Sequence, residues 1–86
     1  MNNQEMTLEF VRILNGWDPF SIGEGNYDTE IADILQALHD LDEEEELANA
    51  MQAIYEFSFE EVLPLENCLA ISKKLMIIKR SGICSL

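Results

Sequence analysis

One stretch constrains the fold of this 86-residue chain more than any other: the segment 17–31, Trp-Asp-Pro-Phe-Ser-Ile-Gly-Glu-Gly-Asn-Tyr-Asp-Thr-Glu-Ile. It holds the only tryptophan, one of the two prolines and two of the four glycines. Residues 16–26 show no helical periodicity, although helical patterns flank them on both sides. Connections in compact domains usually have about 4–6 residues, so a longer one must be fixed by its own side chains, be functional or be disordered. Its aromatic residues argue against disorder.

Apolar residues elsewhere in the chain recur with the spacing of amphipathic helices. The clearest pattern begins at Tyr27, from which apolar residues follow at offsets of 4, 7, 8 and 11. Short connections favour antiparallel neighbours. We therefore predict a single all-α domain over 1–86, a small up-and-down bundle of about four helices with an ordered Trp-Asp-Pro loop. The helices are expected at 4–15, 27–39, 43–57 and 65–80.

Residues that commonly cap helices stand near these predicted ends. Gly16 suits the left-handed position that follows the first helix. Asn26 or Asp28 can cap the second helix, and Asp42 followed by Glu45 has the spacing of a capping box for the third.

The loop residues themselves are expected to be structural. We predict that the Trp17 side chain closes the bundle as part of the core, rather than stacking on a ligand. Pro19 favours an extended Asp18, whose carboxylate can accept a backbone N–H from a short turn at 19–21. The residues expected to build this structural unit are Trp17, Asp18, Pro19, Tyr27, Asp28 and Ile31.

The charge balance is strongly acidic, with 17 Asp and Glu against 5 Lys and Arg and a formal net charge of −12. Such a field repels phosphate backbones and anionic lipid surfaces, so direct binding to nucleic acid or membrane is not expected. We find no signal peptide pattern and no apolar run of the roughly 18 residues that a membrane span needs, and we expect a cytoplasmic protein. Four of the five basic residues lie in the last fourteen positions, which contain no Asp or Glu: Lys73, Lys74, Lys79 and Arg80. In the C-terminal half of the last predicted helix they are expected to complement the negative end of the helix dipole.

No catalytic constellation is recognisable, so we do not expect an enzyme or a cofactor. His39 is the only histidine, and nothing in the sequence links it to Cys68, Cys84 or Ser21 as a nucleophile. Both cysteines are expected to be reduced, with Cys68 as a small buried residue. The weak candidates for a metal site are the carboxylates around the long loop, which do not fit the calcium-loop template in either register: Asp18, Glu24, Asp28 and Glu30.

Leu75, Met76, Ile77 and Ile78 occupy four successive positions of the last predicted helix. They cover roughly 300° of its circumference, more than one neighbouring helix can bury. We expect the N-terminal helix to cover the far side, with contact to a second copy in a homodimer as the alternative.

The chain resembles a known family in three segments. These are Trp-Asp-Pro-Phe at 17–20, Tyr-Asp-Thr-Glu-Ile at 27–31 and Leu-Glu-Asn-Cys-Leu-Ala-Ile-Ser-Lys-Lys-Leu at 65–75. They are similar to the YugE-like family of small uncharacterised cytosolic proteins from bacilli, over about Ile13 to Lys79. The resemblance implies a compact helical fold without an assigned activity, and it carries over no catalytic or cofactor residues.

Two functional hypotheses follow. The first is a non-enzymatic cytosolic protein-interaction module whose carboxylates bind an unidentified, basic protein partner, as an antitoxin, an immunity protein or a nucleic-acid mimic would. The alternative is a regulatory protein that binds a small ligand or a divalent metal at the Trp17–Tyr27 loop.

Overall fold

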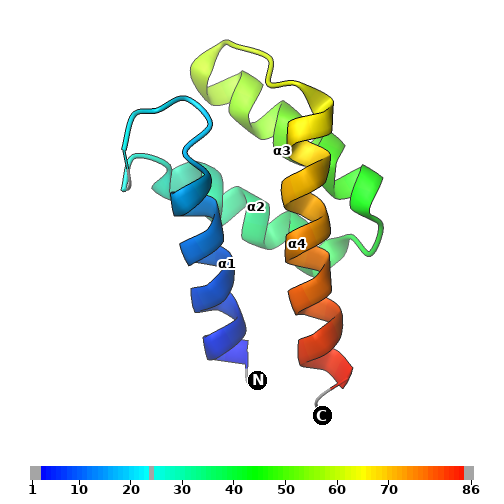
Figure 1. Cartoon of the computed structure of the whole chain (residues 1–86). Coiled ribbons are helices and arrows are strands. Elements are labelled where there is room, and N and C mark those ends of the chain that lie inside the picture. The colour runs from blue at the N-terminus through cyan, green and yellow to red at the C-terminus, as the bar shows by residue number, and fades with distance from the viewer. Residues whose placement is uncertain (1–2, 24, 85–86) are drawn as a thin grey trace.

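The computed structural model describes residues 3–23 and 25–84, and it is built from four α-helices (Figure 1). They are α1 (Asn3–Trp17), α2 (Asp28–Asp40), α3 (Glu44–Phe59) and α4 (Leu65–Cys84). The largest interface joins α3 to α4; α2 packs on α3, and α1 packs on α4 and more weakly on α2. The predicted all-α bundle is confirmed.

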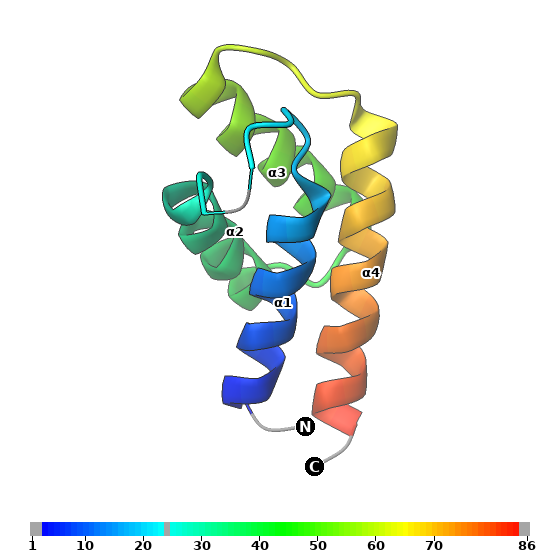
Figure 2. The same cartoon turned by 60° about the vertical axis from the view of Figure 1, so that its left-hand side comes forward.

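The helices form two layers. Helices α1 and α4 lie side by side and run in opposite directions, and α2 and α3 lie behind them in Figure 1. Turning the molecule by 60° shows the loop that joins α1 to α2 crossing above α1 toward the second layer (Figure 2). Each helix therefore has two neighbours and one outward face.

The core is apolar and draws residues from every helix, because each helix buries the stripe that its spacing predicts. Two tyrosines, Tyr27 and Tyr55, are the largest side chains that are fully buried. The buried apolar residues are Phe10, Leu14, Tyr27, Ile31, Ile34, Leu38, Leu47, Ala48, Met51, Tyr55, Leu63, Cys68, Ile71, Leu75 and Met76.

Three helices extend two or more residues beyond their predicted ends, and the largest difference is in α4, which continues to Cys84 instead of ending at 80. Gly16 does not end α1, which continues through Trp17; the backbone then turns at Asp18, whose φ is 37°. Aspartate tolerates positive φ better than most residues, so glycine is not required there. The extended conformation predicted for Asp18 before Pro19 is therefore wrong. Helix α3 likewise continues through Phe59 and ends at Glu60, with φ 58° and an N–H that donates to the Glu56 carbonyl at 2.8 Å.

The predicted N-terminal caps of α2 and α3 are wrong. The N-cap residues are Tyr27 and Glu43, and neither helix has a side-chain capping bond. Asn26 instead donates its side-chain N–H groups to carbonyls within the loop, and Asp42 accepts a hydrogen bond from α4. Acidic residues in the first turn of each helix still lie at the positive end of the helix dipole.

Among the helices that the structure describes, none combines the length and the apolar character that crossing a bilayer requires.

Candidate functional site

The loop between α1 and α2 is held together by the carboxylate of Asp18. Its Oδ1 accepts the backbone N–H of Ile22 at 2.9 Å, and its Oδ2 accepts that of Gly23 at 3.0 Å. The hydroxyl of Tyr27 donates to Oδ1 at 2.5 Å. The Tyr27 hydrogen bond, followed by those from the backbone, lowers the pKa of Asp18. Because both carboxylate oxygens already have donors from the loop, Asp18 is a structural anion.

Tyr27 connects this loop to the core. Its ring is fully buried, and its hydroxyl also accepts the backbone N–H of Phe20 at 3.1 Å. Burial, together with the hydrogen bond to Asp18, raises the pKa of Tyr27, so the phenol stays neutral. A single hydroxyl thus links three positions of the chain, at 18, 20 and 27.

Aromatic rings from the loop pack onto the C-terminal half of α3. Trp17 is half-buried and lies edge-on to Tyr55, with ring centroids 5.5 Å apart and planes at 85°. The ring centroids of Phe20 and Phe59 lie 4.6 Å apart. Those of Tyr27 and Tyr55 lie 5.7 Å apart, in an edge-on arrangement. Such arrangements suit the quadrupoles of the rings. The loop therefore contacts the body of the protein through its aromatic side chains.

Tyr55 has an unusual feature at the centre of this aromatic cluster. Within the described residues its buried hydroxyl has no hydrogen-bond partner. The pKa of Tyr55 is strongly raised, mainly by burial, so its side chain is a neutral phenol. An unpaired buried hydroxyl is destabilising, because it has lost its hydrogen bonds to water.

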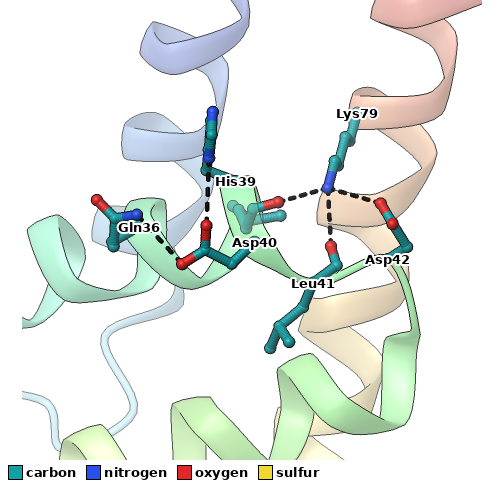
Figure 3. Close-up of polar contacts among 7 residues, drawn as sticks. Gln36, His39, Asp40, Leu41, Asp42 and Lys79 are labelled. Atoms are coloured by element: carbon teal, nitrogen blue, oxygen red, sulfur yellow. Dashed lines mark hydrogen bonds and ion pairs between the residues drawn. The ribbon is translucent and has the colours of Figure 1, made fainter.

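The connection after α2 is held by a cation instead. Lys79, on α4, donates from Nζ to the Leu38 carbonyl at 2.5 Å and the Leu41 carbonyl at 2.7 Å. It also contacts Asp42 Oδ1 at 3.1 Å (Figure 3). Three acceptors satisfy the three protons of the ammonium group. Lys79 thus caps the C-terminal end of α2 from another helix, whereas the sequence indicated only an interaction with the dipole of its own helix.

His39 and Asp40 lie on the exposed side of this connection. His39 Nδ1 lies 3.3 Å from Asp40 Oδ1, and Gln36 donates to the other oxygen of Asp40 at 3.2 Å (Figure 3). The hydrogen bond from Gln36, and then that from His39, lowers the pKa of Asp40. His39 has no nucleophile among its described hydrogen-bond partners.

A pocket of about 580 Å³ opens between α1, α2 and α4 next to this connection. Its size lies in the range of small-molecule sites. Apolar side chains from α1 and α2 form much of its lining, and the Lys79 ammonium is already bound to protein oxygens. No short motif predicts this pocket, because three helices and a connection supply its lining: Met6, Thr7, Phe10, Leu35, Leu38, His39, Asp42 and Lys79.

A second depression, which we call the α3–α4 groove, has a volume of about 300 Å³ and lies on the outer face of the largest helix interface. Helix α3 contributes Glu45, Ala48 and Asn49, and α4 contributes Leu65 and Leu69. The chain that connects the two helices is held beside it, because the Gln52 side chain donates to the Leu63 carbonyl at 2.7 Å.

The structure does not gather the candidate metal ligands. Asp18 is used by the loop, Asp28 is exposed at the start of α2, and Glu30 is buried on the same helix. Glu24 lies outside the described residues. In residues 3–23 and 25–84, no group of three or more His, Cys, Asp or Glu side chains is placed to hold a metal ion.

The apolar turn at 75–78 requires a correction. Leu75 and Met76 are fully buried within one chain, so they are not surface residues, and Ile78 is half-buried against the core. Ile77 alone is exposed, at 62%. Helix α1, which was expected to cover the far side of this helix, packs on α4.

Cys68 is also fully buried, and burial raises the pKa of its thiol. It is therefore a protonated core residue at neutral pH.

Comparison with known proteins agrees with this architecture. A family model described as a domain of unknown function (DUF1871) matches residues 9–85. The uncharacterized protein YugE of Bacillus subtilis (strain 168) is 38% identical over 85 residues, which cover 99% of each chain. A crystal structure of a Bacillus stearothermophilus protein has a TM-score of 0.89 and 34% identity, and covers 92% of this chain and 98% of that one. The chain therefore belongs to the YugE-like family that carries the DUF1871 domain.

Proposed function

We propose that this protein is a non-enzymatic interaction module of the cytoplasm that binds a basic protein partner through its carboxylate-rich surface. The observation that carries the proposal is the excess of acidic groups. With 17 acidic and 5 basic side chains, at least twelve carboxylates have no cation of the same chain to neutralise them. Such a surface attracts a basic partner over a long range and speeds its association.

The basic residues support this proposal because several of them are used internally. Arg12 pairs with Glu9 at 2.7 Å, Lys79 with Asp42 at 3.1 Å and Arg80 with Glu44 at 3.3 Å. Lys79 is mainly committed to the carbonyls at the end of α2.

The acidic groups are also concentrated. The segment 42–66 contains nine Asp and Glu residues and no Lys, Arg or His. Five of the nine are consecutive, at 42–46. The last four of these, at 43–46, line a further surface depression together with Arg80. An antitoxin, an immunity protein or a nucleic-acid mimic would present carboxylates to its partner in this way.

The proposal can be tested by capturing a partner from the lysate of a bacterium that encodes this family. The immobilised protein is expected to retain a basic protein at low salt and to release it at high salt, because salt screens exposed charges. Replacement of Glu43, Glu45 and Glu46 by glutamine is expected to reduce retention. If the same proteins bind equally to an immobilised polyglutamate control, or if none binds, the proposal is wrong.

The pocket between α1, α2 and α4 favours a second candidate function, a regulator that binds a small molecule. The Trp17–Tyr27 loop is a poorer position for such a site, because Asp18 and Tyr27 already bind each other and the loop backbone. Thermal unfolding in the presence of metabolite pools, Ca²⁺ or Mg²⁺ tests this candidate. The candidate is supported if the Tm of the wild type increases and the increase is lost in Leu35→Trp, a variant designed to fill the pocket. An unchanged Tm of the wild type would contradict it.

A further inference from the structure

We propose that the α3–α4 groove is the docking site for a basic amphipathic helix of the partner, an inference that rests on the proposed function and assigns its contact surface. The groove combines three apolar side chains, Ala48, Leu65 and Leu69, with the carboxylate of Glu45 and the amide of Asn49. A groove between two helices is a common seat for an amphipathic helix, which places apolar anchors at helical spacing in it.

Exposed apolar side chains continue from the groove along the chain that joins α3 to α4. Leu65 is 45% exposed, Val62 is 64% exposed, and Phe57 near the end of α3 is 90% exposed. Large apolar residues with such exposure are common singly, but here three fall within nine consecutive residues, and one of the three, Leu65, lines the groove.

The charge around these apolar residues selects the chemistry of the partner. Glu56, Glu60, Glu61 and Glu66 are all exposed and lie among them in the sequence. The first exposed positive charges of α4 after Leu65 are those of Lys73 and Lys74, farther along the helix. A partner helix with Lys or Arg beside its apolar stripe can therefore satisfy both the carboxylates and the apolar side chains.

The same charge argues against a second copy of this chain as the occupant. A symmetric dimer through this face would bring two copies of the acidic segment 42–66 together. Like charges placed opposite each other across an interface oppose association. A basic segment meets no such penalty.

The test uses a fluorescently labelled synthetic peptide of about 18 residues, with leucines at helical spacing in a lysine- and alanine-rich sequence, and a scrambled peptide of the same composition. Fluorescence anisotropy measures binding to the full chain. The amphipathic peptide is expected to bind at least about tenfold more tightly than the scrambled peptide, because only the former aligns its leucines with the groove.

Matched variants locate the site. Leu65→Asn and Leu69→Asn are expected to weaken binding of the amphipathic peptide at least about tenfold. Leu8→Asn, which removes a residue of the same type that is 63% exposed on α1, is expected to leave binding unchanged. Circular dichroism establishes that each variant is folded. The exposed position of Leu65 keeps the test usable if Leu69→Asn does not fold.

Three outcomes of the peptide titrations would overturn the inference: equal binding of the two peptides, equal binding to the wild type and the Leu65→Asn variant, or no binding up to about 1 mM, the limit of weak association. Self-association that Leu65→Asn abolishes, seen by light scattering, would assign the groove to a second copy and also overturn it. The lysate experiment separates the two proposals. A partner captured equally by the wild type and the Leu65→Asn variant would keep the proposed function and reject the groove.

Discussion

The two connections that flank α2 are each held in place by one charged side chain, and the two side chains have opposite charges. Before α2, the carboxylate of Asp18 collects N–H and O–H donors from residues four, five and nine positions away. After α2, the ammonium of Lys79 collects carbonyl and carboxylate acceptors from residues 37 to 41 positions away. Asp18 organises its own loop, whereas Lys79 joins α4 to the end of α2. Hydrogen bonds between residues close in sequence therefore order one loop, whereas hydrogen bonds between distant residues fix how the helices lie relative to one another.

The largest effect is expected from Lys79→Met, which keeps the aliphatic stem but removes the donor. The carbonyls of Leu38 and Leu41 would then lack their donor from α4, and we expect the free energy of unfolding to fall by about 2–3 kcal/mol. Urea denaturation measures the change. Lys74→Met, at an exposed lysine of the same helix, is the control and is expected to stay within about 0.5 kcal/mol of the wild type. Equal stability of the two variants would show that the hydrogen bonds of Lys79 do not stabilise the fold.

A smaller loss is expected from Tyr27→Phe, which keeps the buried ring and removes the hydroxyl. The Phe20 N–H would lose its acceptor and Asp18 would lose its closest donor. We expect the free energy of unfolding to fall by about 1–2 kcal/mol, measured by urea denaturation. A loss as large as that of Lys79→Met would contradict the distinction between local and long-range bonds.

The charge of Asp18 predicts a pH effect that is smaller again. Its pKa in the folded protein lies below the ordinary value, so the stabilisation is present above about pH 4 and is lost as pH falls through the folded pKa. Urea denaturation between about pH 5 and pH 2.5 should therefore show a steeper loss of stability in the wild type than in Asp18→Asn. Parallel pH profiles for the two proteins would show that Asp18 does not contribute as a charged group.

The smallest effect is expected from Tyr55→Phe, the matched control for Tyr27→Phe in the same aromatic cluster. The Tyr55 hydroxyl is buried without a described partner, so its removal leaves no donor or acceptor unpaired. We expect stability to be unchanged or raised by up to about 1 kcal/mol in thermal and urea unfolding. A loss of about 1 kcal/mol or more, which is the net contribution of a typical hydrogen bond, would show that the hydroxyl has a partner such as a buried water.

The sequence predicted the parts of the fold that depend on periodicity. The apolar spacing that starts at Tyr27 predicted α2 to within one residue at each end, because one face of that helix is buried. The sequence also predicted that the Asp18 carboxylate accepts backbone N–H groups, because such partners lie close in sequence. The donors are Ile22 and Gly23, just beyond the predicted turn at 19–21.

The parts that could not be predicted depend on residues far apart in the chain. The partners of Lys79 lie 37 or more positions away, so its position near the end of α4 indicated only a dipole interaction. Asp42 had the spacing of a capping residue, but its carboxylate binds that lysine instead. The α3–α4 groove likewise needs the pairing of two helices, which no local pattern specifies.

We propose that both connections of α2 serve folding, while the partner binds on the outer face of α3 and α4. Anisotropy titrations with the amphipathic peptide, on Tyr27→Phe, Lys79→Met and Leu65→Asn at a temperature where all three are folded, test it most directly. We predict that the first two variants bind as the wild type does and that Leu65→Asn binds at least about tenfold more weakly. Unchanged binding by Leu65→Asn, together with loss of binding in either connection variant, would contradict the claim.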